Sequence, residues 1–231
     1  MAEKFSDQTF KYFDLAKKNR KNKKWFETHR QDYDEHVRLP FSHLIEKIKT
    51  EFSTELPQIK IDPKKISHPC YRANRVPEDG SIIKLQSSTF LSEKPTSMFE
   101  HNPGIYISIG QTSDDCVLGI GLYMVSGRQT SLLRHGLVDD FDEVDSILSS
   151  KKFKKSWAGL SGEKYKRFPK GFDENSPAAE YLMHRQFFLG QNLSRSLICS
   201  KKFESKICAD IESALPALKW VRKTVGTYSR S

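Results

Sequence analysis

The N-terminal part of the chain places its apolar residues at helical spacing. A partial apolar stripe over residues 5–16 predicts a short helix, and Ser6 is well placed as its N-cap. A stronger helical pattern covers residues 25–52, and Pro40 is expected to interrupt it because proline has no backbone N–H. Pro57 ends this helical block.

The middle of the chain changes to the period of a β-strand. Residues 104–110 alternate strictly between apolar and other positions, residues 111–115 read as a turn, and residues 116–124 read as the returning strand. This pattern predicts a β-hairpin. Residues 82–91 predict another strand, and residues 65–75 an irregular one, because proline within it favours an edge or a bulge.

Two glycines, Gly119 and Gly121, lie two apart in the returning strand and so share one face. Without side chains they allow another group to approach the backbone closely. We expect that group to belong to the protein's own packing rather than to a ligand.

Helical spacing returns in the C-terminal part. It predicts helices over residues 127–137, with Ser126 or Gly127 at the start, and over residues 139–148. Residues 157–172 read as a loop-rich stretch, and residues 187–189 as a short strand.

The order of these elements indicates the fold class. A further helix is expected to begin near Pro177, which suits a first helical turn, and the last spans residues 200–225, where Pro216 is expected to kink or divide it. Helices, then an antiparallel sheet with a hairpin, then helices is an α+β pattern. We expect one domain over residues 1–231, with the sheet packed against the N- and C-terminal helices.

Composition excludes several classes of protein. The chain has 231 residues, of which 37% are hydrophobic and 11% aromatic, as in a folded domain rather than a disordered chain. No apolar run is long enough for a membrane helix, so no membrane association is expected. The polar start does not resemble a secretory signal, and the cysteines are too scattered for a disulfide framework, so a cytoplasmic location is expected. They are Cys70, Cys116, Cys199 and Cys208.

The net charge of +9 is unevenly distributed. Residues 1–75 carry 17 Lys and Arg against 11 Asp and Glu, residues 76–150 carry 4 against 11, and residues 151–231 carry 17 against 7. One interpretation is a basic face, built from both ends of the chain, that attracts phosphates or other anions. The other is a solvated surface that keeps a basic protein soluble.

Familiar cofactor and catalytic motifs are missing from the sequence. There is no phosphate-binding P-loop, no Gly-x-Ser-x-Gly elbow and no His-Glu-x-x-His, and the glycines at 119 and 121 lack the third glycine of a dinucleotide fingerprint. His29, Asp32 and His36 would share one face of a straight helix, but solvated helix positions explain them equally well. We therefore predict no cofactor and no metal site.

The most suggestive polar cluster lies in the strand that ends at Arg75. Arg72 and Asn74 project on one face of an extended strand and Arg75 on the other, and the next strand brings Lys84 alongside. Guanidinium groups grip phosphate or carboxylate bidentately, so these residues are candidates for an anion site. Alternatively, carboxylates of the acidic middle segment neutralise them.

His68 and Cys70 lie two residues apart in the same predicted strand and would share a face. A neighbouring base or cation activates a thiol, so either residue is a candidate acid, base or nucleophile. The alternative is that Cys70 is a small core residue.

Several stretches together resemble the DUF2461 family of bacterial and some fungal proteins, over residues 5–225. They are Asn22 to Tyr33 with its Trp-Phe-Glu helix, the Arg72–Arg75 strand, residues 103–106 and 119–124, and Lys166 to Asp173 with Pro177-Ala178-Ala179 following. The resemblance implies a compact α+β domain and no established activity.

The sequence also departs from the family pattern. The polar segment after Arg75 is about three residues shorter than usual, Ser176 replaces the usual His, Tyr123 a common Trp, and Arg185 a common Lys. If the polar segment carries the family's chemistry, this chain is a degenerate or specialised member.

The sequence therefore leaves three functions open. The first is binding of an anionic, phosphorylated or nucleotide-like small molecule, with six candidate residues: Arg72, Asn74, Arg75, Lys84, Lys170 and Arg185. The second is an enzyme acting on such an anion through His68 or Cys70. The third is a module for nucleic acid or an acidic protein partner, for which Tyr106 and Tyr123 are the weak stacking candidates. The sequence does not decide the oligomeric state.

Overall fold

The computed structural model describes residues 4–55, 71, 76–92 and 102–226. The chain packs into two compact units, each built from segments that are distant in sequence. Unit 1 comprises residues 1–95, 106–118 and 192–208, and unit 2 comprises residues 96–105, 119–191 and 209–231.

Unit 1 begins with the predicted short helix, α1 (Asp7–Lys18). Ser6 is its N-cap, as predicted: the Ser6 hydroxyl accepts from the first turn, and the Thr9 hydroxyl accepts from the backbone N–H of Ser6. After α2 (Lys23–Thr28), the chain enters a longer helical segment.

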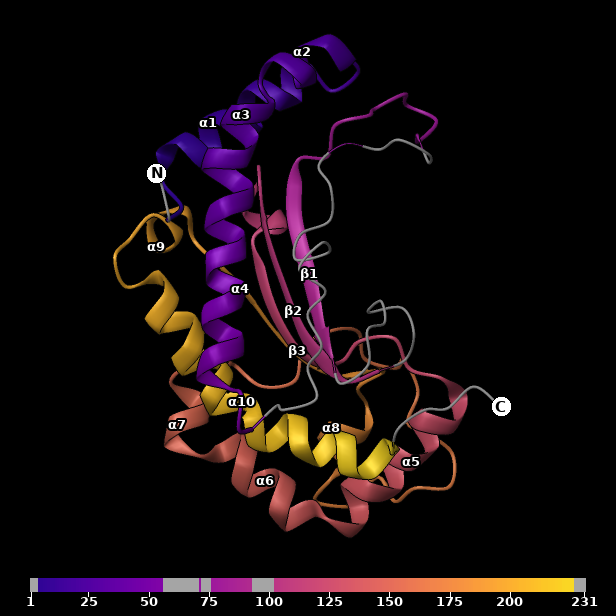
Figure 1. The fold of residues 1–231 in the computed structure, drawn as a ribbon. Helices are drawn as coiled ribbons and strands as arrows, with labels where there is room; N and C mark the ends of the chain where they lie inside the picture. The colour runs from indigo at the N-terminus through magenta and orange to yellow at the C-terminus, as the bar shows by residue number, and fades with distance from the viewer. Residues whose placement is uncertain (1–3, 56–70, 72–75, 93–101, 227–231) are drawn as a thin grey trace. The chain divides into compact units, whose positions relative to one another are not determined.

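That segment consists of α3 (Arg30–Tyr33), the π-helical turn η1 (Asp34–Arg38) and α4 (Leu39–Glu51), which follow one another without a break (Figure 1). Pro40 therefore does not interrupt the helix, and that prediction is wrong. Pro40 lies at the start of α4, directly after the π-turn, where the missing N–H is tolerated.

The backbone carbonyl of His36, four residues before Pro40, cannot bond to a proline N–H. The Thr9 hydroxyl of α1 donates to this oxygen at 2.6 Å. A side chain from another helix thus satisfies the acceptor that Pro40 leaves open.

In the described part of the chain, the predicted antiparallel sheet has four strands in the order β1-β2-β3-β4. They are β1 (Gln86–Ser92), β2 (Gly104–Gly110), β3 (Val117–Leu122) and β4 (Phe187–Asn192). The short 3-10 turn η3 (Ser113–Asp115) joins β2 to β3, so the hairpin is confirmed. The alternating isoleucines of β2 at 105, 107 and 109 are all fully buried.

The glycines of β3 are explained by packing against β4, as expected. A side chain at Gly119 would meet the Phe188 ring at 2.4 Å. One at Gly121, where φ is +122°, would meet the backbone oxygen of Phe187 at 2.3 Å. The close approach of the two strands therefore requires glycine at 121, and at 119 the Phe188 ring lies over the glycine.

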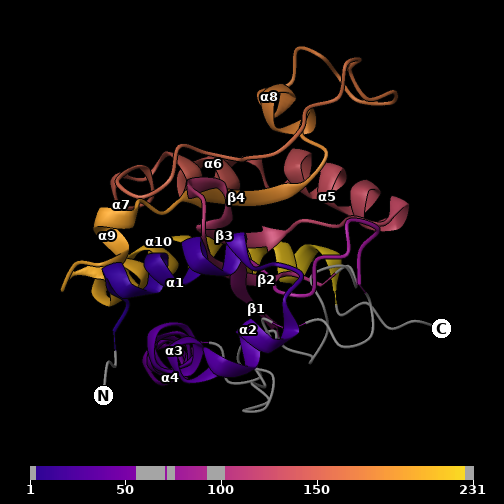
Figure 2. The ribbon, with the colours of Figure 1, turned by 90° about the horizontal axis from the view of Figure 1, so that it is seen from above.

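Unit 2 contains α5 (Gly127–Asp139), α6 (Phe141–Ser149), α7 (Lys151–Lys154) and α8 (Ala179–Leu182). The predicted start of α5 at Ser126 or Gly127 is confirmed: the helix begins at Gly127, and the Ser126 hydroxyl caps it by accepting from the backbone N–H of Gln129. Figure 2 shows the loop before α8 projecting beyond α5 and α6, whereas α8 itself is held to α6, because the Tyr181 hydroxyl donates to the Asp145 carboxylate at 2.8 Å.

Two short elements differ from their predictions. Helix α8 begins at Ala179, so Pro177 lies before the helix rather than in its first turn. Strand β1 begins at Gln86 rather than at residue 82.

After α9 (Arg195–Ile198) follows α10 (Phe203–Val225), one helix that Pro216 does not divide. In unit 2, the Trp220 ring of α10 packs 4.8 Å from the Phe187 ring of β4, measured between centroids. This contact attaches the C-terminal helix to the sheet and confirms that part of the α+β prediction.

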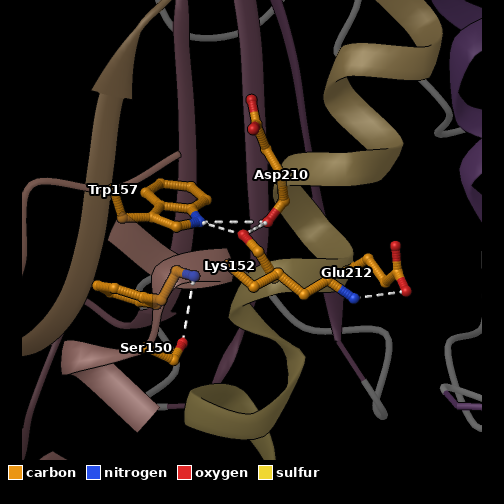
Figure 3. Close-up of polar contacts among 7 residues, drawn as sticks. Ser150, Lys152, Trp157, Asp210 and Glu212 are labelled. Atoms are coloured by element: carbon orange, nitrogen blue, oxygen red, sulfur yellow. Dashed lines mark hydrogen bonds and ion pairs between the residues drawn. The ribbon is translucent and has the colours of Figure 1, made fainter. Parts of the chain in front are cut away.

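A buried polar network holds α10 to the segment after α7 (Figure 3). The indole N–H of Trp157 donates to the Asp210 carbonyl and to the Ser213 hydroxyl, at 3.2 and 3.0 Å. Lys152 and Glu212 form an ion pair at 2.7 Å nearby. The Asp210 carboxylate accepts from the Gln191 amide at 2.9 Å. We interpret the network as structural because its buried groups are bonded to one another.

None of the helices in the described part of the chain is long and apolar enough to cross a membrane.

Candidate functional site

Unit 2 carries a pocket between α5 and the start of β4. It encloses about 280 Å³, including the solvent at its mouth. Its apolar lining is Leu133, Leu137, Leu160 and Phe187, and its polar lining is Thr130, Arg134, Tyr181, His184, Arg185 and Gln186. An apolar wall with a few polar groups is typical of small-molecule sites.

Helical periodicity positions one wall of the pocket. Thr130, Leu133, Arg134 and Leu137 follow one another at spacings of three, one and three residues in α5. Residues three, four and seven apart lie on the same helix face, so all four point to the same side. Arg134 is the charged member of this otherwise apolar or neutral face.

Backbone pairing between two loops forms the other wall. The Tyr165 N–H donates to the Met183 carbonyl at 2.7 Å, and the Arg185 N–H donates to the Glu163 carbonyl at 2.9 Å. Lys164 and His184 form the antiparallel bridge between these bonds. The pairing brings Tyr165 into the same region as two residues of the pocket lining.

Two guanidinium groups lie near the ring of Tyr165. The Arg134 guanidinium carbon is 4.7 Å from the ring centroid, and that of Arg185 is 5.5 Å away. These distances are typical of cation–π contacts.

The two arginines differ in their charge partners. Arg185 is exposed and forms an ion pair with Glu163. Arg134 is half-buried, its Nε is fully buried, and its side chain has no ion pair or hydrogen bond to any residue that the structure describes. Among the described residues, Arg134 is therefore a cation in the pocket wall that no carboxylate neutralises.

His184 lines the pocket with a half-buried ring. Burial, reinforced by the positive charge of Lys164, holds the pKa of His184 below its usual value, although a backbone hydrogen bond to Ser161 and the charge of Glu180 oppose this shift. Its Nδ1 is buried and has no hydrogen-bond partner among the described residues. At neutral pH the ring is uncharged.

Gln186 contributes a neutral amide to the pocket. Its Oε1 is buried without a partner in the described part of the chain. A side chain at Gly162, where φ is +94°, would meet this oxygen at 2.7 Å, so the amide lies directly against the glycine backbone.

Tyr181 is held in its protonated form. Its hydroxyl donates to the Asp145 carboxylate at 2.8 Å, and burial together with this carboxylate raises the pKa of Tyr181 to about 12. Tyr181 is therefore a neutral hydrogen-bonding group in the pocket and not a base.

The sequence-predicted site is only partly described. His68, Cys70, Arg72, Asn74 and Arg75 lie outside the described residues. An antiparallel bridge does join Tyr71 to Ile83, the neighbour of Lys84, as expected if the two predicted strands pair. Lys84 itself is half-buried in unit 1.

Two of the remaining candidates lie in unit 2. Arg185 lines the pocket, whereas Lys170 is exposed on the loop before α8 and does not line it. Sequence reasoning missed Arg134 and His184. The signal for Arg134 was present, because it lies within the stripe that contains Leu133 and Leu137.

The described cysteines are not activated thiols. Burial raises the pKa of Cys116, of Cys199 and, to about 11, of Cys208. Within the described ranges, no group of three or more His, Cys, Asp or Glu side chains is arranged to hold a metal ion.

Comparison with known proteins gives a family match. The model of the family described as "Conserved hypothetical protein (DUF2461)" matches residues 8–220, nearly the whole chain. The chain belongs to the DUF2461 family. The sequence resemblance is thus confirmed. No curated protein and no solved structure matches this DUF2461 protein.

Proposed function

We propose that this DUF2461 protein binds a small anionic molecule in the unit 2 pocket, with Arg134 as the anchor for the negative charge. The observation that carries the proposal is the half-buried Arg134 side chain, which has no ion pair and no hydrogen bond among the described residues. Because partly buried charges are normally paired, an anionic ligand is the natural partner for this group.

The expected contribution of Arg134 is large enough to measure. A hydrogen bond to a charged group contributes about 1.5–3 kcal/mol, which corresponds to roughly 10- to 150-fold in affinity. Tyr165 restrains the guanidinium from one side, so less side-chain freedom is lost when an anion binds.

The test is a thermal-shift panel at fixed ionic strength, followed by calorimetric titration of each anion that stabilises the protein. The panel contains acetate, benzoate, citrate, phosphate, sulfate, sugar phosphates and nucleotides. A ligand specific for the folded state adds about 2.7 kcal/mol of stability at a hundredfold excess over its Kd. We expect Arg134→Gln to weaken binding at least tenfold.

Arg128→Gln is the matched control. Arg128 lies on the same helix and is exposed, so its replacement removes the same net charge outside the pocket. We expect it to leave affinity within twofold of the unmodified protein. Equal losses in both variants, or no stabilisation by any anion, would contradict the proposal.

The site predicted at Arg72, Asn74, Arg75 and Lys84 stays a separate prediction, as do catalysis through His68 or Cys70 and binding of nucleic acid. The bridge between Tyr71 and Ile83 supports the strand pairing on which the first of these depends. The pocket at Arg134 is the better supported site because its lining residues are described together.

A further inference from the structure

We propose that the ligand of the unit 2 pocket is a monocarboxylic acid with a small apolar body, and that the pocket discriminates against phosphate esters. This inference rests on the proposed function, because it names the ligand class of the same site. It follows from the balance of charges around the pocket and from its apolar wall.

Two of the cations around the pocket are paired with carboxylates, whereas Arg134 and Asp145 have no partner of opposite charge among the described residues. Arg185 pairs with Glu163, and Lys164 pairs with Glu180 at 3.5 Å. The Asp145 carboxylate accepts the Tyr181 hydroxyl. The pocket wall therefore offers one positive charge that no described carboxylate neutralises.

A single cation matches a single negative charge. A carboxylate bound to Arg134 would balance the single positive charge of the guanidinium group. Its two oxygens can accept two parallel hydrogen bonds from that group. A phosphate monoester carries nearly two negative charges at neutral pH, so one charge would lie uncompensated close to three carboxylates. His184 does not supply the second positive charge, since burial and the nearby Lys164 keep its ring neutral.

The apolar wall of the pocket indicates that the uncharged part of the ligand is apolar. Leu133, Leu137, Leu160 and Phe187 line the pocket beside Arg134. Burial of apolar ligand surface strengthens binding in proportion to the area removed from water, so a ligand with an apolar body should bind more tightly than one without it.

Four probe molecules separate the contributions. Benzoate carries both the single charge and the apolar body, benzamide has the same shape without the charge, acetate lacks the body, and phenyl phosphate carries the larger charge. Calorimetric titrations at pH 7.5 and fixed ionic strength give the Kd of each. We expect benzoate to bind at least tenfold more tightly than each of the other three.

Two variants assign these preferences to residues. In Arg134→Gln, benzoate and benzamide are expected to bind with the same Kd. Leu160→Ser is expected to reduce the ratio of the acetate Kd to the benzoate Kd at least threefold. In the same variant, benzoate should still bind more tightly than benzamide, because Arg134 is present. Leu160 is half-buried, so this substitution leaves most of the core intact, and the Tm of each variant reports whether it folds.

The outcomes distinguish the inference from the function on which it rests. If phenyl phosphate binds as tightly as benzoate and Arg134→Gln weakens both, the carboxylate inference is wrong and anion binding stands. Equal Kd values for benzamide and benzoate would overturn the inference as well. If neither these probes nor the wider anion panel binds in an Arg134-dependent way, the proposed function itself is wrong.

Discussion

Arg134 and Arg185 illustrate how the surroundings of a residue decide its role. Both guanidinium groups lie near the ring of Tyr165, yet one has a carboxylate partner and the other has none among the described residues. An exposed ion pair contributes little to stability, because water and salt screen it. An unneutralised, half-buried guanidinium is a stronger indication of binding than a paired one on the surface.

His184 gives a pH-dependent prediction at the same scale. Because its pKa is lower in the folded protein than in the unfolded chain, protonation favours unfolding. Above the pKa of the unfolded chain, about 6.5, His184 does not change the free energy of unfolding. As the pH falls from there through the lower pKa of the folded protein, His184 decreases that free energy.

The measurement is a series of urea unfolding curves between pH 8 and pH 5. We expect His184→Asn, which keeps a neutral polar side chain, to lose less stability than the unmodified protein as the pH falls. His135→Asn is the control, because His135 lies on the exposed side of α5. Parallel pH profiles for His184→Asn and the unmodified protein would show that His184 does not contribute.

At the scale of elements, the segment from α3 to α4 shows how a helix accommodates a proline. The π-turn before Pro40 changes the hydrogen-bond pattern, with the Leu39 N–H donating to the Asp34 carbonyl five residues earlier. The carbonyl of His36 is then bonded by the Thr9 hydroxyl. Packing against α1 thus supplies the hydrogen bond that the helix cannot make for itself.

Thr9→Val should consequently destabilise the protein. Valine has a similar shape but no hydroxyl, so the fully buried position would leave the His36 carbonyl unsatisfied and would break the cap with Ser6. We expect a loss of about 1–3 kcal/mol in the free energy of unfolding, measured by urea denaturation.

Thr9→Ser is the matched control for this prediction, since it keeps the hydroxyl and should retain most of the stability. Thr28→Val measures the effect of a threonine-to-valine change that removes no hydrogen bond to another helix among the described residues. The exposed Thr28 hydroxyl donates to carbonyls of its own helix. An unchanged stability in Thr9→Val, or an equal loss in Thr28→Val, would contradict the role given to the Thr9 hydroxyl.

At the scale of the whole molecule, the two compact units share their secondary structure. Strand β2 runs from unit 2 into unit 1 after Ile105, and β3 runs from unit 1 into unit 2 after Leu118. Helix α10 likewise has its first residues in unit 1 and its remainder in unit 2. Neither unit contains a complete strand of the central hairpin.

This sharing supports the expectation of a single domain, which stays a prediction. If it holds, differential scanning calorimetry should show one transition whose calorimetric and van't Hoff enthalpies agree. Fluorescence, with Trp25 in unit 1 and Trp157 and Trp220 in unit 2, should give the same midpoint as circular dichroism. Two separated transitions would show that the units unfold independently.

Much of the architecture could be predicted from the sequence because it depends on local pattern. The strict alternation at 104–110 and the turn after it identified the hairpin, and the serines at 6 and 126 identified two helix starts. Prolines were the main source of error: Pro40 does not interrupt its helix, and Pro216 does not divide α10. Their consequences depend on packing partners that lie far away in the sequence.

The candidate site was predicted least well. Arg185 was one of the six candidate residues, but neither Arg134 nor His184 belongs to a motif that the sequence presents. They meet because the loop containing Tyr165 pairs with the segment before β4, almost fifty residues after Arg134. The spacing of apolar residues along the chain does not predict such a pairing.

Local pattern therefore settled the fold class, the positions of most helices and strands, and membership of the DUF2461 family. Tertiary structure alone decided that Arg134, unlike the exposed arginines, is half-buried and has no carboxylate partner within the described residues. The reason is physical: backbone geometry and side-chain periodicity act between near neighbours in sequence, whereas charge compensation and burial depend on distances in space.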